Sequence, residues 1–559
     1  GDSDGLGGNA TLTLSGTTNI TGGAVTVTSG AADDDEITAG GAATLTFTGN
    51  VTSNSTLAIV GGATAATAAA TVNVAGDATF TTITLNEVAA ISDANLVING
   101  TGTQTIDALI DGAADGEGVI NITNTGGTVT FSKAVGATYD VGSLLIGGAD
   151  TTSATVIFNG AVTFAAATNL GNGIVVIGQT EGSSADVTFK GSASAVSFDM
   201  GVANGSSIGT NGLTFNATGG NTTVTGTIQG KDTEDLNTVT FNGGVSGTAR
   251  VITLATDMGD NIDTLAIGDY TTLLGGGSLN AISATTLSLG SNAVIKTGDA
   301  TTTITAIIDG SVAGNGTLDL DHTTITVGSI GATKAISSID IANGIVYTAK
   351  GAKLNANTIN FANASSELTT ATTATTITGN LVAAATGVGI LDVDIETTIV
   401  GNVGSSTTLD LATTEIADVG LTINGNLYSE AVTLTGADST LTFNGSSAQT
   451  VSGTVAGSSA EHGNIVVGDG TIVSNVTFSS EIGATAIEKF TVSAASTANI
   501  SKDLSFNVVA GDAVVGLDVN GTLNVSSADN TVNIDAKVDG SIDIDGTVGV
   551  TGADNVVFT

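Results

Sequence analysis

The stretch LTFNGSSAQTVSGTVAGSSAEHGNIVVG runs from Leu441 to Gly468, and LVINGTGTQTIDALIDGAADGEGVINIT runs from Leu96 to Thr123. In both, short runs alternate Val, Ile, Leu or Phe with Thr, Ser, Asn or Asp. Gly, together with Asn, Asp, Ser or Ala, closes each run. Alternation with a period of two, bounded by turn residues, predicts half-buried strands. The same pattern of short alternating runs closed by turn residues continues from one end of the chain to the other, so we expect an all-β protein.

The two stretches also align with each other, which indicates an internal repeat. The matched pairs are Asn99 with Asn444, Gly100 with Gly445, Gln104 with Gln449, Thr105 with Thr450, Gly112 with Gly457 and Gly118 with Gly463. Weaker copies begin near Leu213 and Thr301. Related units near residues 96, 213, 301 and 441 predict one continuous repetitive body over residues 1–559.

Repeated short strands are compatible with tandem sandwiches, a propeller or a solenoid. The chain has no Trp and no Pro, lacks linker-like stretches, and shows no tight aromatic period. These features disfavour sandwiches and propellers. A right-handed parallel β-helix fits best, with about 20 to 25 residues in each rung and an elongated rod as the result. The absence of Pro follows, because every inner rung must donate backbone N–H groups to its neighbour.

Individual residues have predicted places in this solenoid. Seven phenylalanines stand at the apolar phase of alternating runs and are expected in the interior: Phe131, Phe158, Phe189, Phe215, Phe241, Phe443 and Phe478. Asn159, Asn242 and Asn444 follow such phenylalanines and are expected at corners with left-handed backbone. The Ala-rich segment 60–74 is the best helix candidate, but its Thr spacing favours a strand, a turn and a second strand.

Composition excludes several functional classes. The chain of 559 residues has no Cys, so disulfide scaffolds, zinc-thiolate sites and cysteine nucleophiles are impossible. Its net charge of −41 would repel nucleic acid and anionic lipid. No stretch approaches about 18 apolar residues, so we expect no membrane-spanning segment. With 41% hydrophobic residues the chain should nevertheless fold.

Carboxylates are the plentiful reactive groups. Three pairs alternate along expected strands and would share one face: Asp319 with Asp321, Asp392 with Asp394, and Asp543 with Asp545. Such pairs could serve a glycosidase. However, Arg, Lys and aromatic residues are scarce, so a solvated acidic face is favoured and the protein is not expected to be an enzyme. That alternative would gain if a groove set paired acids beside a base such as Lys350 or Lys353.

Calcium binding is a further possible role for the carboxylates, beside catalysis and a solvated acidic face. Two acidic clusters supply hard oxygen ligands: Asp33, Asp34, Asp35 and Glu36, and Asp257, Asp260 and Asp263. Residues 1–132 hold acids but neither Lys nor Arg, so stacked segments would repel unless cations intervene. We therefore predict calcium at these residues and expect no other cofactor. The two histidines, His322 and His462, are expected at the surface.

The repeat layout, TFNG followed by QTV, spaced glycines, VTF and IG, resembles the passenger repeats of large alphaproteobacterial autotransporter surface proteins of the rickettsial outer-membrane protein B type. The resemblance implies secretion across a Gram-negative envelope, a β-helical passenger and a coat or adhesive role. The sequence closes at Thr559 without the membrane barrel of that family. It thus predicts either cleavage of that part or another export route.

These observations lead to a non-enzymatic structural protein of the cell exterior that assembles with copies of itself into a surface layer, sheath or filament. Its partners would be other copies and an outer-membrane or cell-surface anchor. The alternatives are an adhesin, as an autotransporter passenger rod that does not polymerise, and a carbohydrate-active β-helix enzyme.

Overall fold

The computed structural model contains strands and turns, and no helix occurs in the residues that it describes. Those residues are 9–30, 41–62, 68–88, 93–147, 153–164, 173–179, 184–201, 208–231, 233–277, 279–298, 303–321, 324–342, 346–349, 353–371, 373–405, 409–507, 515–525, 531–537, 541–544, 547–550 and 555–558. The chain divides into two compact units, Gly1–Ala293 and Val294–Thr559. A single continuous body over residues 1–559 stays a prediction.

The strands of the first unit are β1 (Ala10–Leu14), β2 (Thr18–Ile20), β3 (Val25–Thr28), β4 (Ala43–Phe47), β5 (Val51–Ser53), β6 (Thr56–Gly61), β7 (Ala70–Val74), β8 (Ala78–Glu87), β9 (Ala94–Ile98), β10 (Gln104–Gly112), β11 (Glu117–Ile122), β12 (Thr128–Phe131), β13 (Val141–Ile146), β14 (Ser153–Phe158), β15 (Val162–Thr163), β16 (Ile174–Ile177), β17 (Ser184–Phe189), β18 (Ala193–Met200), β19 (Thr210–Asn216), β20 (Thr222–Gly230), β21 (Leu236–Asn242), β22 (Arg250–Leu254), β23 (Thr264–Ile267), β24 (Thr271–Gly275) and β25 (Ala281–Leu289).

The strands of the second unit are β26 (Val294–Lys296), β27 (Thr303–Gly310), β28 (Thr317–Leu320), β29 (Thr324–Val327), β30 (Ile336–Ile341), β31 (Val346–Ala349), β32 (Lys353–Phe361), β33 (Glu367–Thr370), β34 (Thr375–Ala383), β35 (Ile390–Val393), β36 (Thr397–Val400), β37 (Leu411–Ile416), β38 (Gly420–Ile423), β39 (Leu427–Leu434), β40 (Thr440–Phe443), β41 (Ala448–Gly457), β42 (Asn464–Val467), β43 (Asn475–Phe478), β44 (Ile482–Ile487), β45 (Lys489–Val492), β46 (Thr497–Ile500), β47 (Leu504–Asn507), β48 (Val515–Val519), β49 (Thr522–Val525), β50 (Thr531–Lys537), β51 (Ser541–Ile544), β52 (Thr547–Val550) and β53 (Asn555–Phe558).

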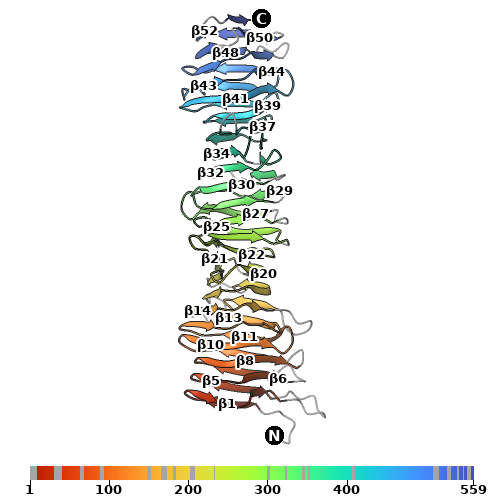
Figure 1. The fold of residues 1–559 in the computed structure, drawn as a ribbon, viewed down its shortest axis with the longest axis vertical. Coiled ribbons are helices and arrows are strands. Elements are labelled where there is room, and N and C mark those ends of the chain that lie inside the picture. Colours follow the sequence, from red (N-terminus) through yellow and green to blue (C-terminus); the bar gives the residue numbers. More distant parts are fainter. Residues whose placement is uncertain are drawn as a thin grey trace. The chain divides into compact units, whose positions relative to one another are not determined.

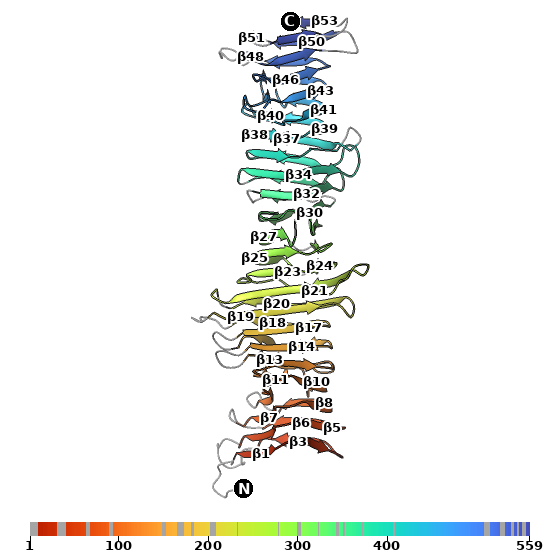
Figure 2. The same ribbon diagram turned by 90° about the vertical axis from the view of Figure 1, so that its left-hand side faces the viewer.

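Within each unit the strands of successive coils pair in parallel, coil upon coil (Figure 1, Figure 2). In the first unit β4 pairs with β7, and β7 pairs with β9. In the second unit β28 pairs with β30, and β30 pairs with β32. The predicted all-β parallel solenoid is therefore confirmed in both units. The described ends of segment 60–74 belong to strands β6 and β7, as predicted.

Coil length varies more than the sequence indicated. The register partners Ile339 and Ile359 lie 20 residues apart along the chain, and Ala43 and Ala70 lie 27 apart. Ala10 and Ala43 are separated by 33 residues, so the last two spacings both exceed the predicted range of coil lengths. Strand-to-strand pairing fixes the paired residues but leaves the length of the connecting segments free, so coils of unequal length can stack.

The interior is built from ladders of identical or similar side chains. All seven phenylalanines predicted for the core are at most 1% exposed. Five of them occupy one register column of the first unit, and their neighbouring ring centroids are 4.6, 5.1, 5.6 and 5.4 Å apart. The column is Phe131, Phe158, Phe189, Phe215 and Phe241. In-register parallel pairing places the same position of each coil at the strand spacing, so these aromatic rings stack directly.

The prediction of left-handed backbone at Asn159, Asn242 and Asn444 is wrong. The non-glycine residues with positive φ in the described parts are Asn261, Tyr270, Asn292, Glu461 and Ala495. Asn159 and Asn444 instead continue the ladder, because their backbone N–H groups donate to the carbonyls of Phe131 and Ile423 one coil away. After Asn242 it is Gly243 that takes the positive φ, at 128°.

The aligned repeat residues occupy equivalent corners in the two units. Gln104 accepts a hydrogen bond from the Gly100 N–H at 3.0 Å, and its amide donates to the carbonyls of Val74 and Gly76. Gln449 makes the same three bonds, with the Gly445 N–H and the carbonyls of Ile423 and Gly425. Each glutamine is 2% exposed. Because a buried amide must be paired, each glutamine clamps its corner to the preceding coil.

Candidate functional site

A polar column stands on the outer side of the second unit, where residues alternate with the buried core. Lys296 pairs in register with Asp319, Asp319 with Asp340, and Asp340 with Asn360. These residues come from β26, β28, β30 and β32. Their neighbours Ile295, Leu318, Ile339 and Ile359 are fully buried, so the alternation directs the polar residues outward.

Lys296 joins two of the carboxylates that the sequence singled out. Its Nζ atom lies 2.8 Å from Asp319 Oδ2 and 2.6 Å from Asp321 Oδ2. The hydrogen bond to Asp319, followed by that to Asp321, holds the pKa of Lys296 above its ordinary value. Burial raises the pKa of Asp319, and this outweighs the hydrogen bond from Lys296. The result is an ion-pair triad across two coils, with the ammonium group between the carboxylates.

This triad changes how the predicted Asp319 and Asp321 pair can be interpreted. A glycosidase pair needs the space between its carboxyl groups for the scissile bond or for water. Here the ammonium of Lys296 occupies that space. Sequence reasoning named Lys350 and Lys353 as candidate bases and missed Lys296, because the register that sets it beside Asp319 depends on coil length. Lys350 lies outside the described residues, and Lys353 is exposed at the start of β32.

Replacing Lys296 by Met should destabilise the second unit. Two carboxylates would then face each other without their cation. All three side chains are partly exposed, so we expect a loss of only about 1 kcal/mol at pH 7. The loss should shrink in acid, because burial raises the pKa of Asp319 and protonation of this carboxylate weakens its pairing with Lys296. Urea denaturation at pH 7 and across the acidic range measures it. Lys133→Met is the matched control, since Lys133 and Asp107 are 3.3 Å apart and more exposed. An equal loss in both variants would contradict the role of the triad.

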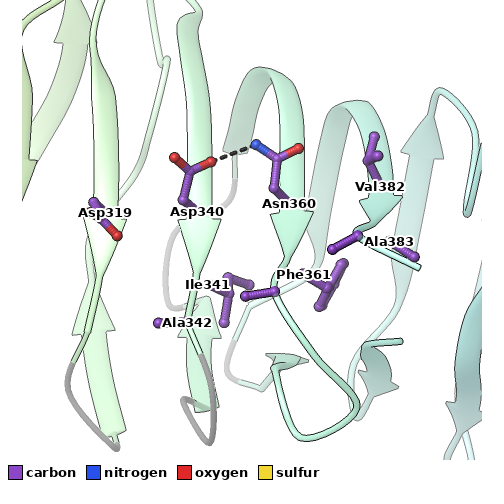
Figure 3. A pocket seen from close by; sticks show the side chains of 10 residues that line it. Asp319, Asp340, Ile341, Ala342, Asn360, Phe361, Val382 and Ala383 are labelled. Atoms are coloured by element: carbon purple, nitrogen blue, oxygen red, sulfur yellow. Dashed lines mark hydrogen bonds between the residues drawn. The ribbon is translucent and has the colours of Figure 1, made fainter. Parts of the chain in front are cut away.

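Next to the column lies a hollow of about 380 Å³. Asp319, Asp340, Asn360 and Val382 line one side, and Ala342, Ala362 and Ala384 contribute small side chains just past the ends of β30, β32 and β34. Figure 3 shows Asp340 and Asn360 side by side, and the Asn360 amide donates to Asp340 Oδ1 at 2.5 Å. The hollow therefore combines an apolar strip with a wall of hydrogen-bond acceptors. No motif in the sequence indicated it.

A second acidic group lies at Asp392. Asp392 pairs in register with Glu415 on the next coil. Burial raises the pKa of Asp392 to about 6, and the charges of Asp394, Glu367 and Glu415 add to the rise. The sequence-predicted pair of Asp392 and Asp394 is thus part of a larger group of like charges on the second unit.

In the first unit, Glu87 at the end of β8 is 7% exposed. Burial raises its pKa to about 7, and Asp93 and Glu117 add to the rise, while hydrogen bonds from the backbone of Gly118 and Ala94 oppose it. A folded-state pKa above the unfolded value stabilises the fold below about pH 4.5, and this stabilisation is lost as the pH rises to about 7.

Glu87→Gln should remove this pH dependence. Because Gln carries no charge, the variant should be more stable than the parent protein by about 1 to 2 kcal/mol at pH 8, after allowance for solvent screening. At pH 4 the two should be equal. Urea denaturation of both proteins across this range measures the difference. A difference that does not change with pH would contradict the assignment to Glu87.

Among the predicted calcium ligands, Asp257, Asp260 and Asp263 lie in the described part of the chain, and they form no group that could hold a metal ion. Asp33, Asp34, Asp35 and Glu36 lie outside the described residues. Asp257 accepts the backbone N–H groups of Asn280 and Ala281, and Asp263 accepts that of Asn237. The backbone carbonyl of Asp260 accepts a hydrogen bond from the N–H of Gly230. Across the described ranges, no three acidic or histidine side chains are grouped as metal ligands. Asp257 and Asp263 therefore fasten neighbouring coils.

The remaining candidates from the sequence are the pair of Asp543 and Asp545 and the two histidines. Asp543 belongs to β51, whereas Asp545 and His322 lie outside the described residues. The Nδ1 atom of His462 is 3.0 Å from the Ser458 hydroxyl.

Comparison with known proteins gives no relative: no family, no curated protein and no solved structure matches the chain. Within the described residues, no helix is long and apolar enough to cross a membrane.

Proposed function

We propose that the chain is a non-enzymatic structural protein of the cell exterior, which assembles with copies of itself into a surface layer, sheath or filament. The observation that carries this proposal is the in-register pairing of coil on coil within each unit. In such a solenoid each coil contacts its neighbours only, so length can grow without a larger globular core. A body of this kind suits a mechanical role.

The charged residues support the same proposal. In the described part of the chain, lysines pair with aspartates of the neighbouring coil: Lys133 with Asp107, Lys231 with Asp199, Lys296 with Asp319 and Asp321, and Lys489 with Asp518. The scarce cations thus connect coils. The large acidic excess remains on the chain, and like charges on facing copies repel unless salt or divalent cations screen them. Assembly should therefore depend on cations.

Electron microscopy of the purified chain tests the proposal. Negative-stain images are recorded in calcium, in calcium with a chelator, and in sodium chloride of matched ionic strength. Ordered lattices or fibres in calcium that disperse with chelator support cation-dependent assembly. Isolated particles under all three conditions would overturn the proposed self-assembly.

A second candidate is an adhesin, a passenger that displays a binding site and does not polymerise. The hollow on the outer side of the second unit favours it. Isolated particles in the images, together with a ligand bound at that hollow, would support this candidate over the assembling protein.

A further inference from the structure

The hollow beside Asp340 has two kinds of wall. Ala342, Ala362 and Ala384 each follow a stacked strand and together form a narrow apolar strip. Beside the strip, Asp319, Asp340 and Asn360 are register partners on successive coils, so their side chains repeat at the strand spacing of about 4.8 Å. A ligand that fits must place an apolar surface on the alanines and donors toward the acceptors.

Charge narrows the choice of ligand. Asp319 already binds Lys296, whereas the carboxylate of Asp340 has a hydrogen bond from Asn360 and no ion pair among the described residues. Asn360 donates through its amide nitrogen, which leaves its Oδ1 free to accept. Figure 3 shows this Oδ1 pointing away from Asp340, so the anionic carboxylate of Asp340 is the acceptor that selects the ligand. An anionic acceptor favours a cation that carries several N–H donors and disfavours any anion.

A metal ion fits less well than an organic cation. Hard divalent metals need six or more oxygen ligands, and the described residues hold no group of three acidic or histidine side chains with suitable placement. An ammonium ion needs fewer acceptors. The same unit already holds an alkylammonium group beside the neighbouring carboxylate: the ammonium of Lys296 lies between Asp319 and Asp321.

From these contacts we infer that the hollow binds a primary alkylammonium group on a short methylene chain, with the ammonium at the Asp340 carboxylate and the methylenes on the alanine strip. The volume of about 380 Å³ is in the range of small-molecule sites. The same chemistry is carried by a free aliphatic diamine and by a lysine side chain. This inference does not depend on self-assembly.

Calorimetric titration at constant ionic strength tests the inference, with 1,4-diaminobutane and Nα-acetyl-lysine amide as probes. Asp340→Asn removes the charge but keeps an acceptor for Asn360, so the fold should persist. It should weaken binding about tenfold or more, the usual effect of losing a charge-assisted hydrogen bond. Ala362→Leu, at an exposed position, fills the strip and should have a similar effect.

Asp392→Asn is the matched control, because it removes one carboxylate from the separate acidic group of the same unit. It should leave the affinity within about twofold, as a remote charge is screened. Binding of the diamine alone identifies a free amine as the ligand, and binding of the lysine probe alone identifies a lysine side chain; either supports the inference. It is overturned if neither probe binds, if Asp340→Asn has no effect, or if Asp392→Asn weakens binding equally.

Discussion

Phe189→Ala is expected to lower the free energy of unfolding by about 3 to 5 kcal/mol. Phe189 is fully buried, with ring centroids of Phe158 and Phe215 at 5.1 and 5.6 Å on either side and Phe198 edge-on at 5.8 Å. Removing the ring breaks the aromatic column in its middle and leaves a cavity that paired strands cannot close by moving. Urea denaturation followed by circular dichroism measures the loss.

Thr188→Ala provides the control, because Thr188 is on the same strand but its side chain alternates to the outer side. Its expected effect is within about 0.5 kcal/mol. If the two substitutions on β17 cost the same, the stability of the unit does not come from its stacked interior.

Gly463→Ala is expected to cost about 3 kcal/mol or more, or to prevent folding of the second unit. Gly463 has a φ of 89°, which L side chains rarely adopt, and an added Cβ would lie 2.3 Å from the Cβ of Leu434. Strain of the left-handed backbone alone is worth about 1 to 2 kcal/mol. The contact with a buried side chain adds to it, since Leu434 is fully enclosed.

Gly470→Ala separates these two causes. Gly470 has a similar φ of 83°, but an added Cβ there meets nothing within 4 Å. This variant should therefore lose only the backbone part, about 1 to 2 kcal/mol, in the same thermal and urea measurements. Equal losses at Gly463 and Gly470 would show that the close approach to Leu434 is unimportant. The aligned Gly118, with Leu85 at the same 2.3 Å, offers an independent repetition in the first unit.

The sequence predicted burial correctly where the alternation of side chains within one strand determines it. The alternation in each short run placed Phe131, Phe443 and their counterparts inside, because strand geometry directs every second side chain to one face. The alignment of Gln104 with Gln449 also pointed to equivalent positions, and both prove to be buried clamps.

The candidate site was harder to predict for a physical reason. Which residues meet across coils depends on register. The spacing between register partners varies from 18 residues, as between Glu415 and Thr433, to 33, as between Ala10 and Ala43, and no local rule fixes it. Hence Asp319 and Asp321 were identified as a pair, but Lys296 between them was missed. The hollow was missed too. Its alanines, Ala342, Ala362 and Ala384, lie far apart in the sequence and form no recognisable motif, so only the register of their strands brings them together. The prediction of left-handed corners at Asn159 and Asn444 failed because the ladder hydrogen bonds extend one residue past Phe158 and Phe443.

The parallel pairing of whole coils has a consequence under load. A pull that separates neighbouring coils within a unit must break all the backbone bonds of one boundary together, and the freed coil then unravels. The coil between Ala70 and Ala94 holds 24 residues, so its release would lengthen the tether by about 80 Å. Each unit would therefore unfold under tension in discrete steps. One coil would be released at a time, while the remaining coils of the unit stay paired.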